Sequence, residues 1–115
     1  MNIVMTRIER FVILKLQGKL EVGEGDAQLR QALRIAVTGG ADNIILDLSK
    51  LSYIDSSGIG EIVKQHQDLY AASVGLCLTH LNNKVYGLFS LTRLISVLPV
   101  YDSNEDAMQL MRPAA

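Results

Sequence analysis

The sequence predicts an α/β fold: a mixed, mostly parallel β-sheet with an N-terminal hairpin and about four helices. Two strand-like segments open the chain and are separated only by a short polar interruption. Helical and apolar strand-like segments then alternate, which is typical of parallel strands joined by right-handed crossovers. Hydrophobic residues make up 49% of the 115 residues, so a single domain with one core is predicted over residues 1–115.

The opening hairpin is predicted from two segments, Ile3–Glu9 and Phe11–Leu16. Apolar side chains alternate with others along the second segment, which is the period of a β-strand. The polar pair Glu9-Arg10 suits the turn between them. Gly18 is expected to end the second strand.

The first helix and the third strand follow. Gly23-Glu24-Gly25 is a flexible approach, and Asp26 is a plausible helix cap. Apolar residues recur at helical spacing over residues 29–37, and Gly39-Gly40 is expected to end that helix. The short apolar segment Asn43–Leu48 comes next, and its composition predicts a buried, central strand.

The remaining elements continue the alternation. A helix is expected over Ser57–Ala72, a strand over Val74–Leu81, a third helix capped by Asn82-Asn83 and a short strand around Leu98–Tyr101. Pro99 places that last strand at a sheet edge or stands at the strand's own beginning. Ser103 is followed three residues later by Asp106, which is nearly a capping box and predicts a final helix. The tail over residues 112–115 is expected to be frayed.

Composition excludes several classes of function. The net charge is −1, with 11 basic and 12 acidic residues, so neither nucleic acid nor an anionic membrane is an expected partner. No apolar segment approaches the roughly 20 residues of a membrane span, and the N-terminus lacks the order of a signal peptide. Cys77 is the only cysteine, so no internal disulfide can form. A cytoplasmic location is the simplest expectation.

The segment DSSGIG, Asp55 to Gly60, stands where a strand is followed by a helix. A helix N-terminus exposes unpaired N–H groups and the positive end of the macrodipole, which suits a negative group such as phosphate. Two interpretations stay open on spacing alone. The polar residues are helix caps and the glycines turn residues, or a serine is a phosphoacceptor on an exposed corner.

Other chemistry finds little support in the sequence. A dinucleotide fingerprint needs three glycines, but Gly58 and Gly60 supply two and Val63 occupies the third position. A serine nucleophile needs a base, and His66 lies two or three turns beyond the serines, where it is expected to pack as a core histidine. His80 has no obvious partner. No cysteine and histidine spacing suits a metal, so neither a metal nor a cofactor is expected, and a binding or switch module is favoured.

Two segments carry a family resemblance. ILDL at residues 45–48 and LSYIDSSGIG at 51–60 resemble the signature of the STAS domain, and more narrowly that of single-domain bacterial anti-sigma-factor antagonists. Gly18 to Glu21 is similar to the G-x-L-D segment of that family, with Glu21 in place of Asp. Residues 83–92 and 100–108 resemble its third helix and its final strand and helix.

The resemblance implies a partner switch controlled by Ser56. In this family the unphosphorylated domain binds an anti-sigma factor that is also a GHKL-type serine kinase. The kinase phosphorylates the serine directly after the aspartate, here Ser56, and the complex separates; a PP2C-type phosphatase restores the hydroxyl. Six further residues are predicted to bind or shape the partner contact, with Ser57 also capping the helix: Asp55, Ser57, Gly58, Ile59, Gly60 and Glu21.

Two alternatives remain. STAS domains also serve as subunits of other assemblies, such as phospholipid transport or signalling complexes. A small enzyme could use Ser56 or Ser57 as a nucleophile, and it would turn over a substrate and react with a fluorophosphonate probe, which a switch module would not do.

Overall fold

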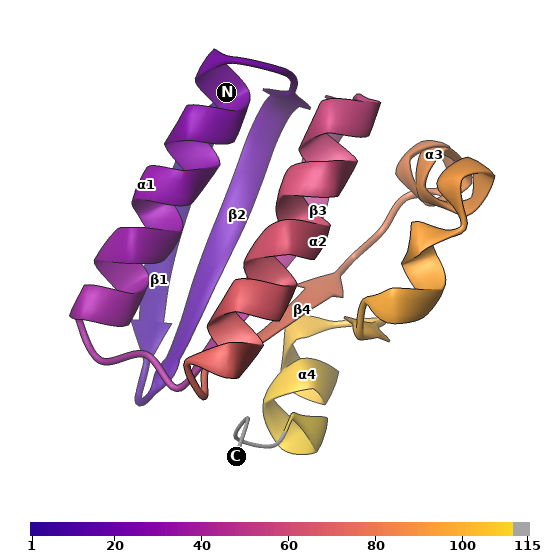
Figure 1. Ribbon diagram of the computed structural model, residues 1–115. Coiled ribbons are helices and arrows are strands. Elements are labelled where there is room, and N and C mark those ends of the chain that lie inside the picture. Colours follow the sequence, from indigo (N-terminus) through magenta and orange to yellow (C-terminus); the bar gives the residue numbers. More distant parts are fainter. Residues whose placement is uncertain (112–115) are drawn as a thin grey trace.

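The fold is a five-stranded sheet with strand order β1-β2-β3-β4-β5 (Figure 1). The computed structural model describes residues 1–111, apart from the side chains of residues 94 and 95; the expected fraying of 112–115 concerns residues outside this range. β1 pairs with β2 antiparallel, and every other neighbouring pair is parallel. The strands are β1 Asn2–Ile8, β2 Phe11–Leu20, β3 Asn43–Ile54, β4 Gly75–Thr79 and β5 Val100–Tyr101. The predicted fold class and the central position of the third strand are confirmed.

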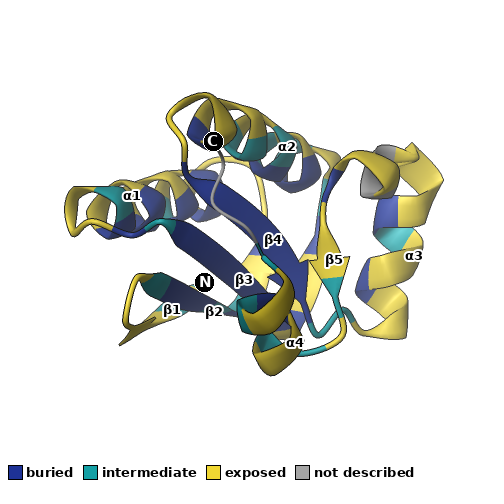
Figure 2. Cartoon of the chain, turned by 90° about the horizontal axis from the view of Figure 1, so that it is seen from below, coloured by how far each residue is buried: buried dark blue, intermediate teal, exposed yellow. Residues whose placement is uncertain are grey.

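The helices cover both faces of the sheet. They are α1 Glu24–Thr38, α2 Ser56–Ala71, α3 Asn83–Thr92 and α4 Asn104–Leu110, with a 3₁₀ turn over Leu94–Val97. Figure 2 shows α1 and α2 against one face and α4 against the other. None of the helices described over residues 1–111 is long and apolar enough to cross a membrane.

Alternation along the strands divides the apolar side chains between two cores. The larger one lies under α1, α2 and α3 and includes Leu14, Leu46 and Leu78 from three neighbouring strands. The smaller one lies under α4 and includes Ile45 and Cys77. The first half of β3, residues 43–48, is buried on both faces, as its apolar composition predicted, whereas the exposed residues lie in its second half: Ser49, Lys50, Ser52 and Tyr53.

β2 and β3 run further than the sequence predicted. β2 continues past Gly18, which has φ 102 but stays within the strand, and β3 reaches Ile54. The reason is two irregularities of pairing, between Lys15 and Gln17 and between Gly18 and Lys19, where β3 contributes one extra residue each time. They leave Leu48, Leu51 and Ile54 all buried at a spacing of three, so the period-2 pattern is lost and the end of β3 was not recognised.

The predicted caps of the two later helices are confirmed. The side chain of Asn82 accepts a hydrogen bond from the Val85 amide at 2.8 Å at the start of α3. The hydroxyl of Ser103 accepts one from the Asp106 amide at 3.0 Å at the start of α4. Both pairs satisfy amides that a helix N-terminus leaves without an internal partner.

A buried polar chain attaches α4 to the sheet. The Asn104 side chain donates to Asp47 Oδ2 at 3.1 Å and accepts from the Thr79 hydroxyl at 2.6 Å. The Ser49 amide donates to Asp47 Oδ1 at 2.9 Å. Burial alone would raise the pKa of Asp47, but the hydrogen bonds from Ser49 and Asn104 and the nearby charge of His80 outweigh it and hold the pKa below its ordinary value of 3.8.

Asp47 is therefore expected to contribute stability that is lost in acid. Its folded pKa is depressed, so the contribution is fully present above the unfolded value of 3.8 and disappears as the pH falls through the lower folded value. Asp47→Asn should lower the free energy of unfolding near neutral pH. The difference in this free energy between the variant and the native chain should become smaller as the pH falls from about 5 to about 2. Urea denaturation at several pH values measures both, and a gap that does not change with pH would contradict the assignment.

Candidate functional site

Two chain turns meet where the parallel strands β2 and β3 end. One joins β2 to α1 and the other joins β3 to α2; in Figure 1 the N-terminal ends of α1 and α2 lie together at the upper end of the molecule. The Asp55 amide donates to the Leu20 carbonyl at 3.2 Å, and the Val22 amide donates to Asp55 Oδ2 at 3.0 Å. The residues Asp55–Gly58, termed the serine corner, are thus fixed to the β2–α1 turn.

Asp55 is the helix cap of α2. Its Oδ1 accepts a hydrogen bond from the Gly58 amide at 2.8 Å, and its Oδ2 holds Val22, so one carboxylate satisfies amides of two turns. The expectation that Ser57 caps this helix is wrong, because α2 begins at Ser56 and Ser57 already lies within its first turn.

The two serines occupy different environments. Ser56 is exposed at the first position of α2, and its hydroxyl forms no hydrogen bond with any described residue. Ser57 is half-buried, and its hydroxyl donates to Asp26 Oδ2 at 2.7 Å. The prediction that Asp26 caps α1 is also wrong: α1 begins at Glu24 after Gly23 and has no side-chain cap, and Asp26 lies in its first turn, only 6% exposed.

The remaining predicted partner-binding residues divide by exposure. Gly60 and Glu21 are exposed, whereas Gly58 is buried and Ile59 is only 2% exposed. A Cβ atom at Gly58 would lie 2.8 Å from the Leu20 carbonyl oxygen, so this glycine is required by the close approach of α2 to the end of β2. Gly58 and Ile59 therefore shape the corner from inside the fold, while exposed residues form its surface.

A surface hollow adjoins the serine corner. It has a volume of about 430 Å³ and is lined by Lys19, Glu21, Val22 and Glu24 together with Met1 and Gly25. Val22, whose amide holds Asp55, is 71% exposed. The β2–α1 turn thus presents the apolar side chain of Val22 and the exposed carboxylates of Glu21 and Glu24, and the Val22 amide fixes this turn to Asp55, the residue before Ser56.

A protein-family model, the STAS domain, matches residues 2–107, which is nearly the whole chain. The chain belongs to the STAS domain family. This STAS domain is similar to BtrV of Bordetella bronchiseptica, provisionally named as an anti-sigma factor antagonist: 29% of 114 aligned residues are identical, over 99% of this chain and 97% of BtrV.

Two solved structures share the fold over most of their length. A provisionally named anti-sigma factor antagonist of Thermotoga maritima aligns with a TM-score of 0.82 and 26% identity, over 93% of this STAS domain and 92% of the other chain. The anti-sigma factor antagonist SpoIIAA in its unphosphorylated form aligns with a TM-score of 0.77 and 25% identity, over 94% of each chain. The family resemblance predicted from the DSSGIG segment is confirmed.

His66 of this STAS domain lies away from the serine hydroxyls. His66 follows Ser56 by ten residues on α2, about 15 Å along the helix axis, and its ring packs at a tilt against Tyr70 with 6.5 Å between the ring centroids. Burial lowers the pKa of His66 and raises the pKa of the Cys77 thiol to about 12. Within residues 1–111 no group of three histidine, cysteine or acidic residues could hold a metal ion.

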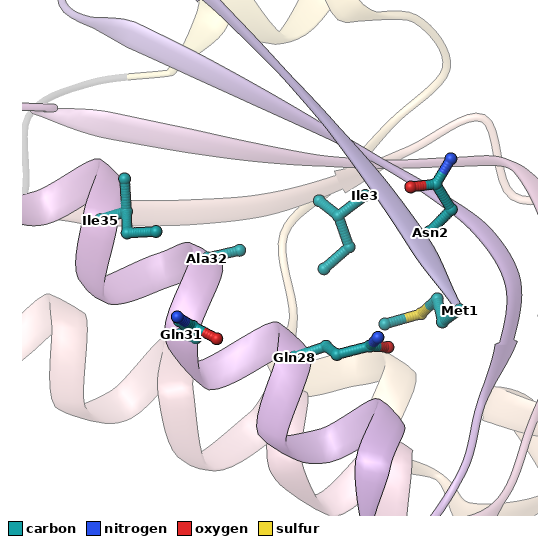
Figure 3. Close-up of a pocket in the computed structure, with 7 residues that line it drawn as sticks. All are labelled: Met1, Asn2, Ile3, Gln28, Gln31, Ala32 and Ile35. Carbon is teal, nitrogen blue, oxygen red and sulfur yellow. The ribbon is translucent and has the colours of Figure 1, made fainter.

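A second groove lies between β1 and α1 (Figure 3). Its volume is about 220 Å³, and it is lined by Met1, Asn2, Ile3, Gln28, Gln31, Ala32 and Ile35. None of these side chains is ionisable. Gln28 stands two positions after Asp26, about 200° around the helix, so the groove and the serine corner lie on different sides of α1. This groove adds no acid, base or nucleophile to the corner.

Proposed function

We propose that this STAS domain is an anti-sigma-factor antagonist that works by partner switching. It binds an anti-sigma factor, itself a GHKL-type serine kinase, while Ser56 carries a free hydroxyl, and it releases that partner when Ser56 is phosphorylated. A PP2C-type phosphatase reverses the modification in the cytoplasm. The observation that carries this proposal is the exposed Ser56 hydroxyl, which has no partner in the described part of the chain and stands at the first position of α2.

The position of Ser56 suits a switch that leaves the fold intact. A phosphate adds about −1.5 to −2 charges, and the positive end of the helix macrodipole tolerates a negative group there. The first turn of α2 contains no acidic residue of its own. The new charge therefore acts mainly on whatever docks at the corner, because a partner that covers it must remove the phosphate from water.

The relatives support the same role. BtrV and the Thermotoga maritima protein carry the name anti-sigma factor antagonist provisionally, and SpoIIAA carries it outright, with a solved form described as unphosphorylated. We infer that this domain acts by binding and has no catalytic activity of its own. A serine hydrolase would instead react with a fluorophosphonate probe, which the proposal excludes.

The first test is phosphorylation in vitro. We expect incubation with the host's candidate kinase and ATP to add one phosphate, on Ser56, as located by mass spectrometry of proteolytic fragments. Ser56→Ala should abolish the modification, whereas the matched variant Ser57→Ala should keep it. Phosphate found only at other residues would contradict the proposal. Stable binding that does not depend on the state of Ser56 would favour a STAS subunit of another assembly.

A further inference from the structure

The contact between Ser57 and Asp26 joins two helices at the serine corner. Ser57 in the first turn of α2 donates its hydroxyl proton to Asp26 Oδ2 at 2.7 Å, and the two residues are 31 positions apart in sequence. One turn further along each helix, Arg30 forms an ion pair with Glu61 at 2.7 Å. The Ser57 hydroxyl therefore points into the interface between α1 and α2 and away from the surface on which Ser56 stands.

Asp26 is an unusual residue at such an interface. It is only 6% exposed, and its Oδ1 is buried without a hydrogen-bond partner. It lies in the first turn of α1, at the positive end of the helix macrodipole, and its Oδ2 accepts the hydrogen bond from the Ser57 hydroxyl. The Asp26 amide also donates to the Glu21 carbonyl at 3.2 Å, which fixes the backbone of this turn against the end of β2.

We propose that Asp26 is a positioning residue that selects Ser56 over Ser57 as the phosphoacceptor. This inference rests on the proposed function. It assigns the choice between two adjacent serines to a buried carboxylate on another helix.

The carboxylate disfavours modification of Ser57 in two ways. The kinase must direct the hydroxyl oxygen at the γ-phosphorus of ATP, but the hydrogen bond to Asp26 holds that hydroxyl toward the helix interface. After transfer, a phosphate of about −1.5 to −2 charges would sit within hydrogen-bond distance of a buried carboxylate. Ser56 meets neither obstacle, because it is exposed and its hydroxyl forms no hydrogen bond with a described residue.

The transfer step itself is an ordinary phosphoryl transfer. A bond forms between the serine Oγ and the γ-phosphorus, the bond from that phosphorus to ADP breaks, and the hydroxyl proton leaves to a base of the kinase. A rival role for Asp26 is to accept that proton from Ser57 and so activate it. The rival makes the opposite prediction, because Asp26 would then promote phosphorylation of Ser57.

The test removes Ser56 and asks whether Ser57 replaces it. With the kinase and ATP, Ser56→Ala should carry no phosphate. Ser56→Ala/Asp26→Ala should carry phosphate on Ser57, at least ten times the background signal measured on Ser57 of the native chain. Ser56→Ala/Asp26→Asn keeps the shape without the charge and should show a smaller gain. Ser56→Ala/Glu24→Ala is the matched control, since Glu24 is an exposed acid in the same turn, and it should remain unmodified.

The outcomes separate the two proposals. If the native protein carries no phosphate on either serine, the proposed function is contradicted, and so is the selection of Ser56 by Asp26, which depends on it. Phosphate on native Ser56 but none on Ser57 in either Asp26 double variant overturns the selection alone. If Ser56→Ala carries phosphate on Ser57, and this phosphate disappears when Asp26 is also changed, the proposed selection is wrong and the rival role of Asp26 is right.

A second measurement needs no kinase. In a double-mutant cycle of Asp26→Ala and Ser57→Ala, the unfolding equilibrium constant should show a coupling of about tenfold, the value for a hydrogen bond to a charged group. Additive effects would show that the two side chains do not interact in solution and would overturn the proposal. The Asp26→Asn variant repeats the cycle if the alanine variant does not fold.

Discussion

Ser56→Asp is expected to weaken binding of the anti-sigma factor about 100-fold while the domain stays folded. The substitution places a permanent carboxylate at the exposed first position of α2, where the proposed partner docks. A partner that covers this position must strip water from the charge, and an unpaired charge buried at an interface costs several kcal/mol. Isothermal titration calorimetry with the purified partner measures the change in Kd directly.

Ser56→Asn is the control for that experiment. Asparagine has nearly the shape of aspartate but no charge, so it should bind within a fewfold of the native chain if the switch is electrostatic. Both variants should unfold at nearly the same urea concentration as the native chain, because a substitution at an exposed position changes the free energy of unfolding by about 0.5 kcal/mol or less. Equal affinity of Ser56→Asp and the native chain would contradict the switch, and equal weakening by both variants would show that shape, not charge, is read.

Gly58→Ala is expected to lower the free energy of unfolding by about 2 kcal/mol, within the range for overpacking. The added Cβ would lie 2.8 Å from the Leu20 carbonyl oxygen and 2.9 Å from Ile54 Cγ1. The Leu20 carbonyl oxygen is a backbone atom and already accepts a hydrogen bond from the Asp55 amide. It cannot move without breaking this hydrogen bond between the two turns. Because the corner must shift, phosphorylation of Ser56 should also slow. Urea denaturation and the rate of phosphate incorporation measure the two effects.

Gly60→Ala is the matched control for Gly58. Both glycines lie in the first two turns of α2, but a Cβ at Gly60 would meet no atom within 4 Å. Alanine there should raise the free energy of unfolding by about 0.5 to 1 kcal/mol, the difference in helix propensity. Similar effects of the two substitutions would show that the corner is not tightly packed around Gly58.

Much of the fold could be predicted because local pattern and tertiary packing agree. Glu9-Arg10 forms the predicted two-residue turn between β1 and β2, and the caps Asn82 and Ser103 act where their spacing placed them. The full length of β3 could not be predicted, because its two irregularities depend on pairing with β2, a partner about 30 residues away. The alternation of apolar residues therefore failed to predict the end of β3, because pairing with a distant strand determines the structure there.

The site was predictable in part for the same reason. The DSSGIG segment identified the corner and the family, and the exposure of Ser56 agrees with its predicted role. The bond from Ser57 to Asp26 was missed, because an acid after Gly25 has the sequence appearance of a helix cap. Only the packing of α1 beside α2 distinguishes a capping carboxylate from one that holds a side chain of another helix.

The two irregularities of β3 also constrain how this chain can change in length. Each supplies one extra residue before the serine corner, and together they bring Leu51 and Ile54 back to the core face. Deleting one of the two exposed residues at either irregularity would restore the period of two and leave Leu51 and Ile54 on the core face. In the regularly paired stretch of residues 43–47, by contrast, the same deletion would turn the side chains on one side of it to the opposite face of the sheet. Changes in the length of β3 are therefore tolerated best at the two irregularities.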